Sequence, residues 1–317
     1  MSQPSNTYDS YDNANSIRED VQSIIYNIAP DETPFLSACK KTTAKSTLHE
    51  WSTDTLRASA DNKHIEGDDS VATAITGVTR LNNRTQIFKD AIVISDTDEG
   101  LSKIAKDKEM AYRILKAGKT MKLDIEKALF DNNAKVAGSS TAARELAGAP
   151  TWLTSNTVKG TGGADANGTG SNARTDGTQT VFTQAKFDTV MQSVWENGGT
   201  GSKTAYLSAF NMTKCLGFAG NNNQRANVVG ADERVINSIS IYLTPWGEIS
   251  LRPTRENRSR DVFLMQSDTW QVATLRPMKN VELAKTGDNS KRQLTTELTL
   301  VCTSEAANGM VADCTTS

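Results

Sequence analysis

The most regular pattern of apolar and polar positions lies in residues 96–133. Apolar side chains recur there at about 100° per residue, which predicts one long amphipathic helix. Asp96, Thr97 and Asp98 supply a cap and first-turn carboxylates that suit the positive end of the helix dipole. At ~1.5 Å per residue this helix spans roughly 50 Å, so we expect a structural strut, with Gly118 as a point for a bend. Its inward stripe is predicted to contain Leu101, Ile104, Ala105, Ala111, Tyr112, Leu115, Leu123, Leu129 and Phe130.

Two extended runs precede this helix. Residues 46–58, with the bulky Trp51, and residues 80–95 have the composition of strands, and the stretch 59–70 between them is polar. Together they predict a long two-stranded excursion from the core. A two-stranded ribbon is only marginally stable alone in water. Its length therefore makes sense only if it lies against another surface.

The N-terminal region changes character at Ser16. Residues 1–16 are too polar to bury much apolar area, which predicts an arm. Ser16 then begins a capping pattern and a short helical spacing of apolar residues, which Pro30 ends. A turn at residues 31–36 leads into a second short apolar segment, residues 35–39.

The C-terminal half has shorter patterns. Residues 137–177 lose periodicity and include a Gly-, Asn- and Thr-rich stretch that predicts a surface loop. Residues 182–197 predict a helix, and strand-like runs around it predict a mixed core. These runs are residues 205–208, 238–243, 248–251, 262–265 and 270–275. Residues 281–285 and 293–302 predict a closing hairpin, and the alternation in its second strand indicates that this strand is half-buried.

Length and charge narrow the function classes. A chain of 317 residues is long enough for one large or two smaller cores. Its net charge of −2 provides no overall attraction to nucleic acid, which argues against a dedicated DNA-binding function. The polar N-terminus does not resemble a secretory signal, and no run approaches the ~20 apolar residues of a membrane helix. We expect a soluble protein made in the cytoplasm.

The residues that usually carry chemistry form no recognisable site. The four cysteines are scattered without metal-ligand spacing, which fits reduced thiols. His49 and His64 both lie in the excursion, where a structural or solvent-exposed role is favoured. No nucleophile or nucleotide-binding signature is present. We therefore expect no enzyme activity, no catalytic residue, no cofactor and no metal.

Two charged clusters each leave two interpretations open. An acidic concentration suits either a divalent cation or, with more support, a solvated turn; it contains Asp54, Asp61, Glu66, Asp68 and Asp69. A basic run suits nucleic acid or, with more support, intersubunit or surface salt bridges, because it has no interleaved aromatic residues for base stacking; it contains Arg252, Arg255, Arg258 and Arg260.

The order of elements is arm, short helix, ribbon, strut helix and mixed core, and four short stretches add detail to it. They are Arg18-Glu19-Asp20-Val21, the run from Ile28 through Pro30-Asp31-Glu32-Thr33-Pro34 to Leu36, His49-Glu50-Trp51 with Asp54 and Leu56, and Glu66-Gly67. In this order and these residues the chain resembles tailed-bacteriophage major capsid proteins of the Hong Kong 97 fold, more specifically their podovirus-type branch.

The resemblance implies an α+β fold with five parts. Residues 1–45 would form the N-terminal arm and short helices, 46–95 the E-loop hairpin, and 96–139 the spine helix with the start of the P-domain. Residues 140–275 would form the A-domain, and 276–317 the C-terminal P-domain strands.

The implied function is that of a subunit forming hexamers and pentamers of an icosahedral head around double-stranded DNA. Expected partners are other copies of the chain, scaffold and portal proteins, a decoration protein, and DNA bound only non-specifically, with no membrane. The location would be the virion, after assembly in the host bacterial cytoplasm. No lysine–asparagine crosslinking pair can be assigned, so we expect a non-covalent shell. Two alternative functions remain: a decoration, fibre or adhesin-type structural protein, and an enzyme with a divergent active site.

Candidate intersubunit contacts are chosen from the excursion and from the basic run. They are Trp51, Asp54, Arg57, Arg84, Phe88, Arg255 and Arg258.

Overall fold

The computed structural model describes residues 32–69, 72, 75, 77–101, 108–218 and 241–316. The arm expected in residues 1–16 and the helix expected after Ser16 lie outside the described residues, as do residues 238–240 of one expected strand. The described helices are α1 (Pro34–Ala38), α2 (Asp96–Gly100), α3 (Glu109–Phe130), η1 (Ala149–Thr151), α4 (Gln184–Glu196), α5 (Ala209–Leu216) and η2 (Ser267–Thr269). The described strands are β1 (Lys40–Thr43), β2 (Leu48–Thr53), β3 (Thr79–Arg84), β4 (Gln86–Ser95), β5 (Thr157–Val158), β6 (Lys203–Leu207), β7 (Ile241–Thr244), β8 (Gly247–Pro253), β9 (Val262–Met265), β10 (Trp270–Glu282), β11 (Asn289–Cys302) and β12 (Gly309–Val311).

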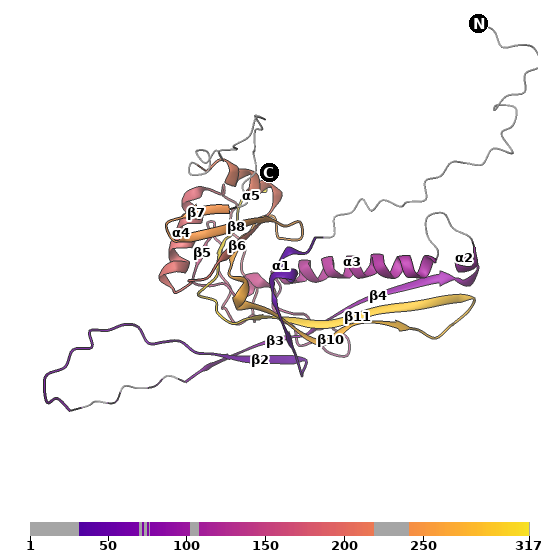
Figure 1. Cartoon of the computed structure of the whole chain (residues 1–317), viewed down its shortest axis with the longest axis horizontal. Coiled ribbons are helices and arrows are strands. Elements are labelled where there is room, and N and C mark those ends of the chain that lie inside the picture. Colours follow the sequence, from indigo (N-terminus) through magenta and orange to yellow (C-terminus); the bar gives the residue numbers. More distant parts are fainter. Residues whose placement is uncertain are drawn as a thin grey trace, which may run out of the picture.

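A long four-stranded sheet, in the order β1-β10-β11-β4, forms one half of the molecule. Strand β1 runs parallel to β10, and the other neighbours are antiparallel. Helix α3 lies along this sheet beside β4 (Figure 1). Met121 and Ile125 of α3 are buried, as are Phe88 and Ile94 of β4, so the apolar face of the helix covers one face of the sheet.

A second sheet, in the order β5-β12-β9-β6-β8-β7, forms the other half together with α4 and α5. Its core contains Phe187 and Val190 of α4 packed with strand residues such as Leu207 and Ile249. A separate aromatic core lies where the two sheets approach each other, with Phe130, Tyr206, Phe263 and Trp270 at its centre. The chain length predicted one large or two smaller cores. The described residues form two large clusters of buried residues.

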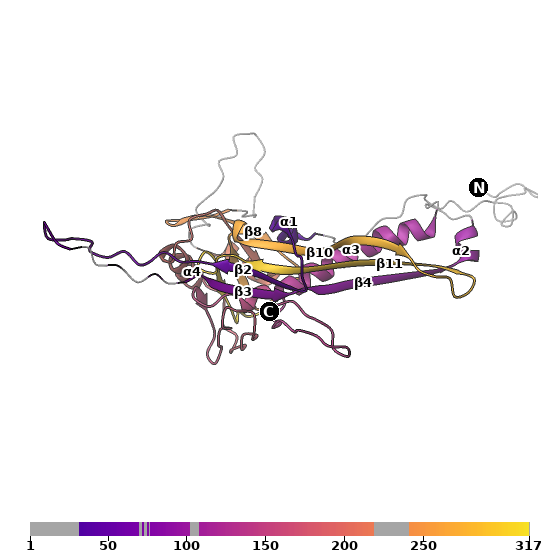
Figure 2. The same ribbon diagram turned by 90° about the horizontal axis from the view of Figure 1, so that it is seen from below.

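Strands β2 and β3 form a separate two-stranded ribbon, paired from Leu48–Arg84 to Thr53–Thr79. Both views show this ribbon and the chain that follows β2 extending away from the body, at the opposite end of the molecule from α2 (Figures 1 and 2). The predicted excursion is thus present. Its second run is divided at Thr85, and the part beyond it, β4, pairs with β11 instead of β2.

The prediction of one continuous helix over residues 96–133 is wrong. Helix α2 ends at Gly100, Leu101 is extended with ψ 142°, and α3 begins only at Glu109. The expected stripe also fails at three of its described members, because Leu101 is 60% exposed, Leu115 is 72% exposed and Ala111 is exposed as well. Ile104 and Ala105 lie outside the described residues. The cap of α2 is Ser95, which accepts a hydrogen bond from the Asp98 amide, and not one of the three residues expected to provide it. Asp96 and Asp98 lie in the first turn, as the sequence indicated.

Strand β11 is more deeply buried than its alternation predicted. From Thr296 to Cys302 every residue is buried, on both faces of the sheet. The second face is covered by β3, from which Asn83 donates a hydrogen bond to the Leu300 carbonyl, and by Arg144, which pairs with Glu297. An alternating pattern of Leu and Thr cannot reveal this cover, because threonine is compatible with either environment.

Other differences concern boundaries. The expected strand at 270–275 and the first two residues of the one expected at 281–285 belong to a single strand, β10, which ends at Glu282 and is irregular between Thr274 and Lys279 around Pro277. Ser208, expected in a strand, caps the unexpected helix α5. Residues 137–177, which have no periodic pattern in the sequence, include the buried residues Leu146 and Trp152, both before the Gly-rich stretch that was expected to be a surface loop. Strand β9 has the predicted bounds.

Candidate assembly surfaces

The base of the ribbon is fixed to the core by hydrogen bonds, among them those of Trp51 and Asn83 and those that Lys135 donates to Asn82. Trp51 of β2 donates from Nε1 to the Cys302 carbonyl at 2.9 Å, and its ring centroid lies 5.3 Å from that of Trp152. Asn83 of β3 is fully buried; its Nδ2 donates to the Leu300 carbonyl at 2.8 Å, and its Oδ1 accepts from the Ala147 amide at 2.9 Å. These bonds fix the point from which the ribbon leaves the body.

Beyond this base the chain is open to solvent. Every residue from 54 to 69 is exposed, including the apolar Leu56 at 99% and Ile65 at 82%. The hydrogen bonds of Asp54 and Arg57 described here are local, to the Thr55 amide and the Ala58 carbonyl. Apolar side chains with this exposure gain nothing from their own fold, and a neighbouring surface could bury them.

The base of the N-terminal segment is held by a carboxylate of α3. Glu126 is fully buried, and its two oxygens accept from the amides of Phe35 at 2.9 Å and Leu36 at 2.7 Å. Thr33 makes no side-chain cap to α1, so Glu126 satisfies amides that would otherwise lack partners. Burial raises the pKa of Glu126 to about 7, although the two amide bonds oppose this shift.

The ring of Phe35 completes this attachment. Its centroid lies 4.8 Å from that of Phe130, 5.4 Å from Tyr206 and 5.8 Å from Trp270. The Thr33-Pro34-Phe35-Leu36 stretch, which contributed to the resemblance, is therefore a packing element at the junction of α1 with the aromatic core.

A network of three arginines and three aspartates lies beneath the loops of the second sheet. Its members are Arg174, Arg258, Arg260, Asp176, Asp261 and Asp313. The Arg174 side chain is fully buried and lies 3.2 Å from both Asp176 and Asp313. The network ties the Gly-rich loop to the chain before β9 and to the C-terminal segment.

Asp313 is central to this network. It adopts the left-handed conformation, with φ 58°, and accepts hydrogen bonds from the amides of Gly160 and Gly177. Burial works against its charge, but hydrogen bonds from Arg174 and these amides hold the pKa of Asp313 below its usual range.

The structure divides the seven candidate contact residues into two groups. Asp54, Arg57 and Arg255 are exposed and free to meet another surface. Trp51 and Arg84 are half-buried at the ribbon base, Phe88 is 8% exposed, and Arg258 is paired within the chain to Asp176 and Asp261 at 2.6 Å. The favoured interpretation of the basic run was that it forms salt bridges. Arg258 does so, but with partners in its own chain.

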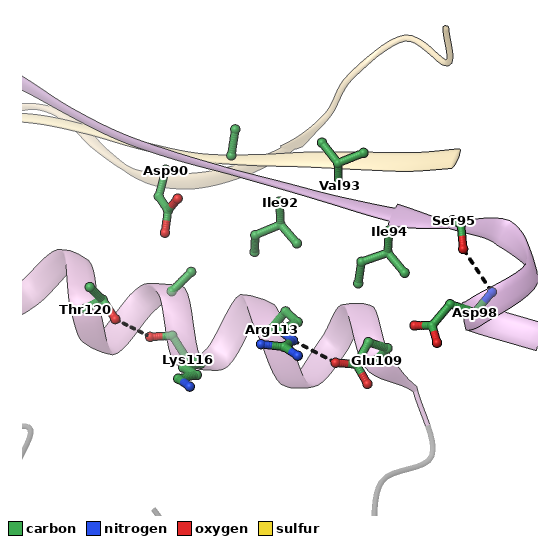
Figure 3. Close-up of a pocket in the computed structure, with 12 residues that line it drawn as sticks. Asp90, Ile92, Val93, Ile94, Ser95, Asp98, Glu109, Arg113, Lys116 and Thr120 are labelled. Atoms are coloured by element: carbon green, nitrogen blue, oxygen red, sulfur yellow. Dashed lines mark hydrogen bonds and ion pairs between the residues drawn. The ribbon is translucent and has the colours of Figure 1, made fainter. Parts of the chain in front are cut away.

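An open groove of about 630 Å³ lies between β4 and the N-terminal part of α3 (Figure 3). Ile92 and Ile94 point into it from β4, and Arg113 pairs with Glu109 at 2.7 Å on the helix side. Charges of both signs line the groove, and it contains no arrangement of nucleophile and base.

The cysteines and histidines have structural environments. All four cysteines are buried and none forms a disulfide, and burial raises the pKa of both Cys215 and Cys314 to about 12, which makes the thiolate scarce at neutral pH. Burial lowers the pKa of the half-buried His49, and His64 is exposed.

Among the described residues no cluster of His, Cys, Asp or Glu could hold a metal ion. None of the described helices combines the length and apolar character needed to cross a membrane.

Four important residues were not singled out by the sequence: Glu126, Asn83, Arg174 and Asp313. Glu126 gave a weak signal, since it is a carboxylate between the apolar Ile125 and Ala128 on a predicted helix. Asn83, Arg174 and Asp313 gave none, because most of their partners are far away in the sequence, such as Leu300 for Asn83 and Asp313 for Arg174.

Solved structures with similar folds come from phage and phage-like shells. The capsid asymmetric unit of Cyanophage A-1(L) has a TM-score of 0.64 at 12% identity and covers 95% of this chain and 98% of that one. The capsid of a native GTA particle has a TM-score of 0.62 at 11% identity, covering 95% and 96%. A projecting ribbon, a spine helix along a long sheet and a second mixed sheet therefore define the Hong Kong 97-like capsid fold, as the resemblance implied.

The sequence comparisons give the family. The SU10 major capsid protein family matches residues 3–315, so this chain belongs to that family of phage major capsid proteins. The major capsid protein of Escherichia phage Phieco32 is 25% identical over 324 residues, with 90% of each chain covered. Family membership favours a capsid subunit over the decoration, fibre or adhesin alternative.

Proposed function

We propose that copies of this major capsid protein assemble as hexamers and pentamers into an icosahedral phage head that encloses double-stranded DNA. The observation that carries the proposal is the ribbon, which is anchored firmly at its base and yet exposes Leu56 and Ile65 beyond it. An anchored arm with exposed apolar residues is suited to bind a neighbouring subunit.

The parts of the chain take the roles that the resemblance implied, with two adjustments that strand pairing supports. Residues 46–95 were expected to form the E-loop, but β4 pairs with β11, so we assign the E-loop to the chain from β2 to β3. Strand β10 pairs with β11 from Trp270 onward, so we place the start of the C-terminal P-domain strands there instead of at residue 276. The N-terminal arm (1–45), spine (96–139) and A-domain (from 140) keep their predicted roles.

Among the candidate contacts, we propose that Asp54, Arg57 and Arg255 meet neighbouring subunits directly. Trp51, Arg84, Phe88 and Arg258 act from inside the subunit, by holding the elements that carry those contacts. The shell is non-covalent and the subunit has no enzymatic role. The resemblance also leads us to propose scaffold, portal and decoration proteins as partners. On the same basis we propose assembly in the host bacterial cytoplasm and membership of the podovirus-type branch.

Electron microscopy of the protein expressed alone and with its phage's other head proteins tests the proposal. Closed shells or hexameric and pentameric capsomers are expected. A particle that stays monomeric under all these conditions would contradict it.

A further inference from the structure

Helix α3 presents a concentrated positive charge on a nearly neutral protein. From Met110 to Leu123 the sequence contains four basic residues and no acidic residue. These four, Arg113, Lys116, Lys119 and Lys122, recur at every third position, so they follow one i±3 ridge of the helix. We call the three lysines of this set, Lys116, Lys119 and Lys122, the lysine ridge; Arg113, one turn before them, pairs with Glu109 at the start of the helix.

The lysine ridge is exposed on a firmly seated helix. All three lysines are exposed, and the side chain of Lys116 extends away from β4 (Figure 3). The opposite side of α3 is held by Met121 and Ile125, which are 2% and 3% exposed. At ~1.5 Å rise per residue, the Cα atoms of successive lysines in the ridge lie about 4.5 Å apart along the helix axis. This spacing places several charges within reach of one polyanion.

We propose that the lysine ridge is a sequence-independent contact for the phosphate backbone of packaged DNA. This inference rests on the proposed function, in which the shell encloses DNA. Lysine ammonium groups act as point charges toward phosphates. Beside the ridge, Ala111, Leu115 and Gly118 have no hydrogen-bonding side chains with which to read bases, and the exposed Thr120 donates its hydroxyl to the Lys116 carbonyl of the same helix. A ridge of this kind binds the DNA backbone without discriminating between base sequences.

Another occupant would be the acidic loop of a second copy, residues 54–69. It lies at the opposite end of the molecule from α2 and the start of α3 (Figures 1 and 2), so only another subunit's loop could reach the ridge. That loop interrupts its five carboxylates with Arg57 and Lys63. DNA has one charge per ~1.7 Å of its axis, a much denser partner for three closely spaced lysines.

The test compares two triple variants of the full-length subunit. Lys116→Gln/Lys119→Gln/Lys122→Gln removes the ridge, and Lys41→Gln/Lys45→Gln/Lys89→Gln removes three exposed lysines elsewhere. Each is titrated with a fluorescent 30-base-pair duplex at several KCl concentrations, followed by anisotropy. For the ridge variant we expect the slope of log affinity against log salt to fall by about 2–3 and affinity at low salt to fall about ten- to a hundredfold. The matched variant should keep most of the wild-type slope.

A synthetic peptide of residues 54–69 serves as the competing probe. If the peptide binds the ridge more tightly than the duplex does, or if both triple variants lose DNA affinity equally, the proposal is overturned. Electron microscopy of both variants is read separately. Shells that form normally while DNA binding is lost support the ridge assignment, whereas failure of the wild-type protein to form shells would count against the proposed function instead.

Discussion

At the scale of single residues, the subunit relies on a few buried ionisable side chains that hold distant segments together. Glu126 holds α1, and Arg174 with Asp313 holds the Gly-rich loop and the C-terminal segment. A buried charge that loses its partner is costly, whereas an exposed charge contributes little. Substitutions of matched chemistry should therefore differ sharply between buried and exposed positions.

Glu126 should make stability depend on pH. Its pKa is raised by burial from 4.5 to about 7, so the folded protein keeps a proton that the unfolded chain releases. This stabilising contribution is fully present below about pH 4.5 and is lost as pH rises to about 7, a change of about 3 kcal/mol. Urea unfolding of unassembled wild-type and Glu126→Gln subunits between pH 5 and 8 measures it. The wild type should lose stability relative to the variant over this range, and Glu248→Gln, at an exposed position, should parallel the wild type. Parallel curves for all three proteins would refute this role of Glu126.

Arg174→Met should destabilise the subunit by about 3–5 kcal/mol, because it leaves Asp176, Asp261 and Asp313 with an uncompensated buried charge. Arg255→Met, in the exposed part of the same half of the molecule, should change stability by less than about 0.5 kcal/mol. Thermal unfolding of both variants is the measurement. Equal effects of the two substitutions would mean that the network is not a structural lock.

At the scale of elements, the ribbon is a local hairpin whose orientation depends on remote contacts. The pairing of β2 with β3 could be anticipated from two extended runs, but where the ribbon leaves the body depends on bonds from Trp51 and Asn83 to the core. The spine gives the opposite case. The helical period of its apolar residues was visible in the sequence, but the interruption after Gly100 was not. The apolar spacing continues across the point where α2 ends, so the spacing does not reveal the break.

Asn83→Ala should loosen the ribbon base. The substitution leaves the Leu300 carbonyl and the Ala147 amide without their side-chain partner, at a cost of about 2–4 kcal/mol. Asn280→Ala, at an exposed position of β10, is the matched control and should be nearly neutral. Hydrogen exchange should show faster exchange in β2 and β3 for the first variant only. Unchanged protection there would show that the bonds of Asn83 are not needed to hold the ribbon base.

At the scale of the whole molecule, a body with two sheets carries an extension that has no surface of its own to cover it (Figure 2). Assembly gives such an extension a binding surface, and many weak contacts repeated in a closed shell sum to a stable particle. The arrangement therefore separates two kinds of side chain: those that keep the subunit folded and those whose contribution appears only in the shell.

The double substitution Leu56→Ser/Ile65→Ser tests this separation. Both side chains are almost fully exposed, so the isolated subunit should unfold within about 0.5 kcal/mol of the wild type. Shell formation, measured by sedimentation and electron microscopy, should be strongly reduced because the apolar contacts between subunits are lost. Normal shell yield would exclude these residues from the interface.

The sequence by itself determined the kind of elements and the family resemblance. The ribbon, the helix over residues 184–196 and strand β9 could all be found from local periodicity, because each signal lies within one short segment. Tertiary structure alone decided which faces were covered. Threonines of β11 became buried, Arg258 found partners inside its own chain, and Glu126 became the cap of a helix 90 residues earlier. These outcomes depend on segments that meet only after folding, and a local pattern contains no information about what will pack against it.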